Sequence, residues 1–117
     1  MIPKTDSFKF ALKGIVELFK TQRNAQFHLV AAIIVVSLGA YFNITASEWL
    51  FIVLAIMAVL SAEGLNTAIE WLGDEVHRTH NQTVGRAKDV AAGAVLITAG
   101  GAAIIGFIIF IPYFLNS

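Results

Sequence analysis

The sequence predicts an all-α membrane protein in which three transmembrane helices follow an amphipathic N-terminal helix. Of its 117 residues, 57% are hydrophobic and 14% are charged, and the mean hydropathy is +0.75. Soluble domains carry about 25% charged residues, so this composition is typical of a membrane protein. The length allows a single domain, 1–117, and the chain contains three long apolar stretches. We therefore expect one membrane domain.

The first predicted element, at about 5–22, is an amphipathic helix. Apolar residues such as Phe8, Leu12, Ile15 and Phe19 recur there at helical spacing, and lysines such as Lys9 lie between them. This pattern predicts a helix that lies in the membrane interface. The alternative is an ordinary amphipathic helix whose apolar face packs on protein.

The three apolar stretches predict transmembrane helices at about 27–43, 49–72 and 88–115. The first is short and crosses a bilayer only if it is tilted or extends into the interface. The third is rich in small residues. Its spacings from Ala99 to Ala103 and from Ala102 to Gly106 permit close contact between helix backbones.

The distribution of basic residues predicts the orientation in the membrane. Arg78, Arg86 and Lys88 lie between the second and third predicted spans, and lysines are frequent before the first span. The stretch 43–48 has neither lysine nor arginine. Because positive charge is enriched on the cytoplasmic side, we expect a multi-pass protein with a cytoplasmic N-terminus.

Charge and cysteine content exclude several functions. The formal net charge is zero, so phosphate has to be bound by local clusters, and we expect no nucleic-acid partner. The chain has no cysteine, which excludes disulfides, thiol catalysis and thiolate metal sites. The sequence also lacks a GxxxxGK[ST] loop, which argues against a conventional soluble nucleotide-binding fold.

A polar stripe inside the second predicted span is the most informative feature of the chain. At about 100° per residue, its members fall on one side of a helix. They are Glu63, Asn66, Thr67, Glu70 and Asp74. A carboxylate inside hydrocarbon costs roughly 2.5 kcal/mol or more, so it requires a partner, a water-filled cavity or a bound cation. The stripe therefore predicts a functional site.

Lys88 and Asp89, at the predicted start of the third span, lie on the same side of the membrane as this stripe. Magnesium is commonly shared between carboxylates and phosphates, and a further carboxylate can accept a proton from an attacking hydroxyl. The residues thus predict a polar site near the cytoplasm, suited to Mg²⁺ and nucleotide phosphates. Two alternatives stay open on these grounds. One is a small ion- or proton-translocating subunit, and the other is a purely structural helical protein.

Two sequence blocks resemble those of the small bacterial membrane kinases that include diacylglycerol kinase and undecaprenol kinase. EGLNTAIEWLGD, at 63–74, matches the pattern E-x-x-N-[ST]-[SA]-x-E-x-x-x-D. GRAKD, at 85–89, and AVL, at 94–96, match a second block, and the resemblance extends over about 8–110. It implies a homotrimer in the bacterial inner membrane that transfers the γ-phosphoryl of ATP to a lipid hydroxyl, with Mg²⁺ as cofactor.

The resemblance also implies roles for individual residues. Glu63 is expected to be the general base toward the lipid hydroxyl, and Glu70 is expected to hold the cation that bridges the ATP phosphates. Asn66 is expected to orient this constellation. The residues expected to bind the nucleotide are Asn66, Asp74, Lys88 and Asp89.

The region before the first span indicates the branch of this family. Diacylglycerol kinases of the proteobacterial type carry a second metal-holding glutamate there, whereas this chain has Asn24, followed by His28. We expect Asn24 to offer an amide oxygen as a weaker metal ligand. The string R-N-x-x-x-H is more similar to the undecaprenol kinase branch, so undecaprenol is slightly favoured over diacylglycerol as the substrate. No chemical role is assigned to His28.

Overall fold

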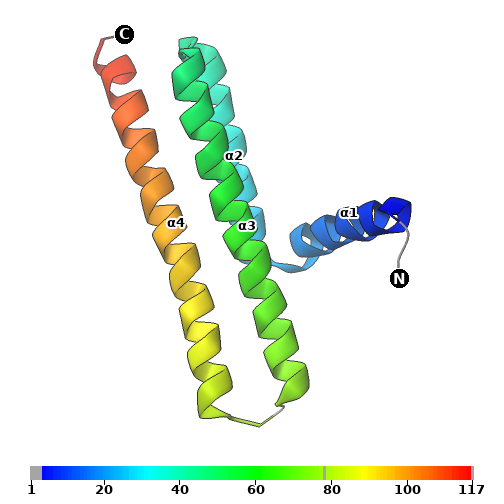
Figure 1. Ribbon diagram of the computed structural model, residues 1–117. Coiled ribbons are helices and arrows are strands. Elements are labelled where there is room, and N and C mark those ends of the chain that lie inside the picture. Colours follow the sequence, from blue (N-terminus) through cyan, green and yellow to red (C-terminus); the bar gives the residue numbers. More distant parts are fainter. Residues whose placement is uncertain (1–3, 78, 117) are drawn as a thin grey trace.

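The computed structural model describes residues 4–77 and 79–116, which form four helices. These are α1 (Lys4–Thr21), α2 (Arg23–Phe42), α3 (Ala46–Val76) and α4 (Gln82–Leu115). Helices α2, α3 and α4 run side by side, whereas α1 leaves the bundle at a steep angle (Figure 1). α3 contacts both α2 and α4 and is therefore the central helix. α2, α3 and α4 are each long and apolar enough to cross a membrane, which confirms the predicted all-helical fold with three such helices.

The helices extend beyond the predicted apolar stretches. α2 begins at Arg23 rather than at 27, α3 extends beyond 49–72 at both ends, and α4 begins at Gln82 rather than at 88. The predicted limits marked where apolar residues begin and end, whereas backbone hydrogen bonding continues through the polar residues beyond them. Lys88 and Asp89 consequently lie inside α4 and not at its start.

α2 is much shorter than its two neighbours. Its 20 residues correspond to about 30 Å of helix, which equals the thickness of a bilayer's hydrocarbon core. The 31 residues of α3 and the 34 residues of α4 correspond to about 46 and 51 Å. The α3–α4 hairpin therefore projects beyond the beginning of α2 (Figure 1). Arg78, which contributes to the predicted orientation, lies outside the described residues.

Local polar groups fix both turns of the bundle. Asn43 ends α2 in the left-handed conformation, with φ of 52°. α3 begins with a capping box, in which the Thr45 hydroxyl accepts from the Glu48 N–H at 3.2 Å and the Glu48 carboxylate accepts from the Thr45 N–H at 2.9 Å. The Asn81 side chain begins α4 by accepting a hydrogen bond from the Val84 N–H at 3.0 Å.

The buried apolar core lies near the α2–α3 turn. Its buried members are Ile44, Ile52, Ile109 and Phe110. Trp49 packs against this cluster and covers Gly39, where an added Cβ would lie 2.7 Å from the indole ring. Many large apolar side chains elsewhere on the bundle are exposed, as expected of helices that face lipid or further protein.

α1 meets the bundle at the level of the polar stripe. The Gln26 side-chain amide, on α2, donates a hydrogen bond to the Phe19 carbonyl oxygen at 2.9 Å. On α3, Gly64 faces Leu18, and an added Cβ would lie 3.6 Å from the leucine methyl. Because Gly64 follows Glu63 in the sequence, the C-terminal end of α1 lies next to that glutamate.

Candidate active site

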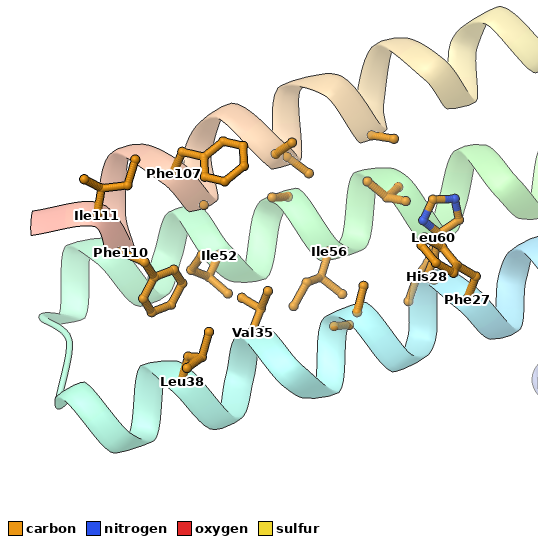
Figure 2. Close-up of a pocket in the computed structure, with 18 of the residues that line it drawn as sticks. Phe27, His28, Val35, Leu38, Ile52, Ile56, Leu60, Phe107, Phe110 and Ile111 are labelled. Atoms are coloured by element: carbon orange, nitrogen blue, oxygen red, sulfur yellow. The ribbon is translucent and has the colours of Figure 1, made fainter. Parts of the chain in front are cut away.

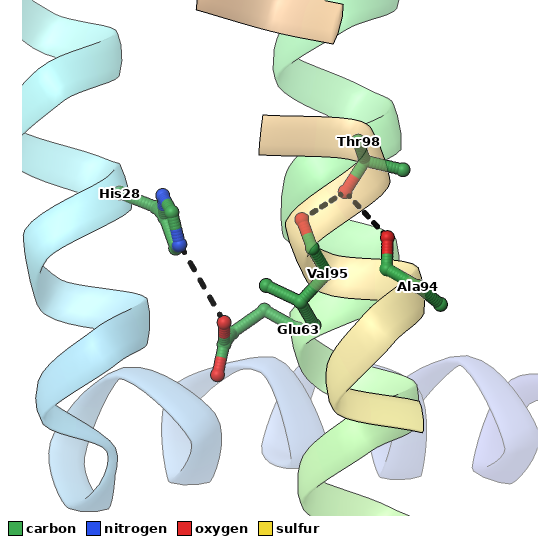
Figure 3. Close-up of polar contacts among 5 residues, drawn as sticks. All are labelled: His28, Glu63, Ala94, Val95 and Thr98. Atoms are coloured by element: carbon green, nitrogen blue, oxygen red, sulfur yellow. Dashed lines mark hydrogen bonds and ion pairs between the residues drawn. The ribbon is translucent and has the colours of Figure 1, made fainter. Parts of the chain in front are cut away.

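Glu63 is the most deeply buried polar side chain in the described part of the chain. It is 2% exposed, and its Oε2 has no hydrogen-bond partner among the described residues. The His28 Nε2, on α2, lies 3.6 Å from this oxygen (Figure 3). A buried carboxylate without a hydrogen bond is costly. This arrangement therefore indicates a functional role for Glu63.

Asn66 and Thr67 continue the polar stripe along α3. Thr67 is buried, and Asn66 is half-buried with an Oδ1 that lacks a hydrogen-bond partner within the described ranges. Two buried acceptors without a donor, Glu63 Oε2 and Asn66 Oδ1, thus lie on one side of the same helix. Buried polar atoms are nearly always hydrogen-bonded in native proteins, so open acceptors are suited to a ligand's donor or a cation.

Glu70, Asp74 and Lys88 form a charged cluster on the projecting α3–α4 hairpin. The Lys88 ammonium donates a hydrogen bond to the Asp74 carboxylate and lies 3.7 Å from Glu70 Oε2. Gly73 permits this approach, because an added Cβ would lie 3.2 Å from Lys88 Cε. The Glu70 and Asp74 side chains are 44% and 64% exposed, so this cluster is open to a soluble ligand, in contrast to Glu63.

The two remaining predicted site residues, Asp89 and Asn24, lie at exposed positions. Asp89 is next to Lys88, and Asn24 is in the first turn of α2. Residues 4–77 and 79–116 contain no group of three or more His, Cys, Asp or Glu side chains placed to hold a metal ion. The carboxylate of Glu70 nevertheless fits Mg²⁺, which is usually held by one or two carboxylates together with substrate phosphates.

Sequence analysis assigned no role to His28, which the structure places 3.6 Å from Glu63. His28 lies on the face of α2 that also carries Ala25, Ala32, Val35 and Gly39, all of them buried or half-buried. The signal was present in the sequence as helical spacing, because positions 25, 28, 32, 35 and 39 recur every three or four residues. A histidine on the inward face of one span and a glutamate on the next are candidates for a pair.

An apolar groove extends along the bundle from His28 (Figure 2). It has a volume of about 540 Å³, and residues of α2, α3 and α4 line it. Bulky side chains such as Val35, Ile52 and Phe107 alternate in its walls with small ones such as Ala55. His28 contributes the imidazole at one end, so the groove leads from an apolar part of the bundle to the neighbour of Glu63.

The chain is similar to known membrane kinases over most of its length. The family model for prokaryotic diacylglycerol kinase matches residues 9–110. Undecaprenol kinase of Bacillus subtilis (strain 168) is 43% identical over 106 residues, which are 91% of this chain and 86% of that protein. Diacylglycerol kinase of Synechocystis sp. is 33% identical over 111 residues, 94% of this chain and 63% of that protein. Diacylglycerol kinase of Haemophilus influenzae is 27% identical over 92 residues, 79% of this chain and 78% of that protein.

The structure thus places a buried carboxylate near an apolar groove and a charged cluster on the projecting hairpin. The chain belongs to the prokaryotic diacylglycerol kinase family, and it is a lipid kinase. The resemblance carried by the blocks at 63–74 and 85–89 is thereby confirmed.

Proposed function

We propose that this protein transfers the γ-phosphoryl of ATP to the hydroxyl of a membrane lipid, and that undecaprenol is favoured over diacylglycerol. The observation that carries the lipid-kinase chemistry is the buried Glu63 carboxylate near the end of the apolar groove. The preference for undecaprenol is supported by the 43% identity to the Bacillus subtilis undecaprenol kinase. The string RNAQFH at 23–28 supports the same preference.

In this proposal Glu63 is the general base. Its carboxylate accepts the proton of the lipid hydroxyl, the hydroxyl oxygen bonds to the γ-phosphorus, and the bond to the leaving ADP oxygen breaks. Glu63 precedes Gly64, which faces Leu18 of α1, and it lies between the apolar groove and the charged cluster of the projecting hairpin. The hydroxyl of a lipid lies at such a boundary, and the hydrocarbon chain extends along the groove toward Phe107.

The charged cluster on the hairpin is the proposed nucleotide site. Glu70 supplies a carboxylate oxygen for Mg²⁺, and Lys88 supplies a positive charge for a phosphate group. Asp74 holds the Lys88 ammonium in place, and Asp89 follows it on α4. Asn66 lies on the stripe between this cluster and Glu63, where its amide orients the reacting groups. Bound Mg²⁺ would neutralise negative charge on the phosphates.

We also propose that α1 lies along the cytoplasmic surface of the bacterial inner membrane. Phe8, Leu12 and Ile15 are exposed and do not pack on the bundle, which favours the interface over the alternative of an ordinary packed helix. α2 then spans the hydrocarbon core, and the hairpin that carries Arg86 and Lys88 projects into the cytoplasm. The exposed apolar faces of the bundle are available to lipid and to the other copies of the proposed homotrimer.

A transfer assay tests this function. Purified protein in detergent–lipid micelles receives γ-labelled ATP, Mg²⁺ and, in parallel, undecaprenol or diacylglycerol. We expect label in both or one of the lipids, with the higher kcat/KM for undecaprenol. A higher kcat/KM for diacylglycerol would overturn the lipid preference. Absence of label from both lipids, with a folded protein, would overturn the proposed substrates.

A further inference from the structure

We propose that His28 is a positioning residue, which holds the Glu63 carboxylate in the orientation that accepts the proton of the lipid hydroxyl. This inference rests on the proposed role of Glu63 as the general base. The observation behind it is the 3.6 Å separation between His28 Nε2 and Glu63 Oε2, an oxygen that has no hydrogen-bond partner among the described residues.

The environment of Glu63 requires a neighbour of this kind. Its side chain is 3% exposed, so water does little to solvate its charge. Lys88 is engaged elsewhere, because its ammonium contacts Asp74 and Glu70. Within the described part of the chain, His28 is the residue whose nitrogen lies within ion-pair distance of the Glu63 carboxylate. An imidazole N–H is thus the donor available to orient it.

The separation is slightly longer than a direct hydrogen bond. Hydrogen bonds of catalytic groups are commonly long in the absence of substrate and shorten in the reacting complex. His28 is carried by a helix rather than by a loop, and its ring stands edge-on to Phe27, with ring centroids 5.8 Å apart. A helix places a side chain more precisely than a loop does, as positioning requires.

His28 also lies between the groove and the carboxylate. It lines one end of the groove, and its side chain is 18% exposed. A lipid whose chain occupies the groove therefore brings its hydroxyl next to His28 and Glu63 together. The pair then acts as one unit, in which Glu63 takes the proton and His28 fixes the direction of the accepting oxygen.

Three substitutions at position 28 separate positioning from packing. His28→Gln keeps an N–H donor near the place of Nε2, whereas His28→Leu keeps the apolar contacts and removes the donor. We expect His28→Leu to lower kcat by about 10- to 100-fold, as for loss of a hydrogen bond to a charged group. The KM for ATP should stay within about twofold, because the charged cluster is separate from position 28. His28→Gln should recover most of the lost kcat.

His28→Asn is the third variant, and it tests the loss of the donor if His28→Leu fails to fold. Its amide is polar but too short to reach Glu63, so kcat should fall as in the leucine variant. His80→Leu is the matched control, since His80 is an exposed histidine in the α3–α4 loop, and its turnover should equal that of wild type. Circular dichroism and monodisperse elution in micelles identify the folded variants.

The steady-state kinetics of these variants, measured beside Glu63→Gln, decide the proposal. Wild-type kcat in folded His28→Leu, or in folded His28→Asn, would overturn it. Equal losses of kcat in His28→Gln and His28→Leu would also overturn it, because the N–H donor that glutamine retains would then not support turnover. If Glu63→Gln keeps wild-type turnover, the general-base assignment itself fails. If Glu63→Gln is inactive and His28→Leu is normal, only the role of His28 fails.

Discussion

At the end of the bundle that contains the α2–α3 turn, a carboxylate oxygen of Glu48 is hydrogen-bonded, whereas near α1 two buried acceptor oxygens have no hydrogen-bond partner among the described residues. Glu48 accepts hydrogen bonds from the Thr45 N–H at 2.9 Å and from the Tyr113 hydroxyl at 2.5 Å. By contrast, Glu63 Oε2 and Asn66 Oδ1 have no hydrogen-bond partner in the described residues. Both glutamates belong to α3, so one helix carries a hydrogen-bonded carboxylate oxygen, Glu48 Oε1, and a buried one, Glu63 Oε2, without a hydrogen-bond partner in the described part of the chain.

The comparison shows that the residue type alone does not decide the role of a glutamate in a membrane helix. A carboxylate oxygen that accepts hydrogen bonds from the start of α3 and from α4 joins these helix ends and stabilises the fold. A carboxylate whose donors are missing contributes little to stability and is ready to accept a proton or a donor from a ligand. Substitutions at the end with the α2–α3 turn should therefore change stability, and substitutions near α1 should change activity.

Glu63→Gln should have the largest effect of any single substitution. Removal of the base should lower kcat by about 10²- to 10⁴-fold, the usual contribution of general-base catalysis. The amide removes a buried charge, so the unfolding temperature should be equal to or higher than that of wild type. Initial rates of label transfer and thermal unfolding in the same micelles measure both quantities. Wild-type turnover would show that Glu63 is not the base.

Ile52→Ala tests the opposite end of the bundle. Ile52 is 2% exposed within the apolar core, and its truncation should lower the free energy of unfolding by about 2–5 kcal/mol. The KM for ATP should be unchanged, because Ile52 lines the apolar groove and not the charged cluster. Ile104→Ala is the matched control, because Ile104 is 60% exposed and should lose much less stability. Equal losses at both positions would argue against the buried core described for this end.

Glu70→Ala should weaken Mg²⁺-dependent ATP binding by about 10- to 100-fold, on the scale typical for damaged metal sites. The variant removes the carboxylate oxygen proposed for the cation but leaves Lys88 and Asp74 paired. Isothermal titration with ATP at fixed Mg²⁺ measures the change. Glu17→Ala, at an exposed position of α1, provides the control with the same loss of charge. Identical titration curves for wild type and Glu70→Ala would remove Glu70 from the nucleotide site.

Tyr113→Phe should have the smallest effect of the four. It removes the hydroxyl that donates to Glu48 and should lower the free energy of unfolding by about 1–2 kcal/mol, with no change in kcat. Tyr41→Phe is the matched control, since Tyr41 is 77% exposed, and it should be neutral. A loss of turnover in Tyr113→Phe without a loss of stability would contradict the division between the two ends.

The sequence predicted the helices and the polar stripe because both depend on periodicity along one chain segment. The burial of Glu63 depends on which face of α3 meets its neighbours, and a place in an apolar span does not determine it, since Leu65 in the same span is 66% exposed. The partners of the stripe likewise depend on how neighbouring helices are aligned. The contact of Lys88 with Asp74 requires the α3–α4 turn, and the approach of His28 to Glu63 requires the packing of α2 on α3. Spacing within one segment does not determine these alignments.

The helix ends were also less predictable than the helices. Apolar residues mark the part of a helix that faces lipid, whereas α3 and α4 continue through polar residues into the projecting hairpin. Hydrogen bonding of the backbone and the Asn81 cap set the beginning of α4, and hydropathy does not detect either.

The measurement that tests the central claim most directly is label transfer from γ-labelled ATP to undecaprenol by wild type, Glu63→Gln and Tyr113→Phe in identical micelles. If the end near α1 is the catalytic one, wild type and Tyr113→Phe should transfer label at equal kcat, and folded Glu63→Gln should transfer almost none. Equal transfer by wild type and Glu63→Gln would contradict the account, because the buried carboxylate would then have no part in the reaction.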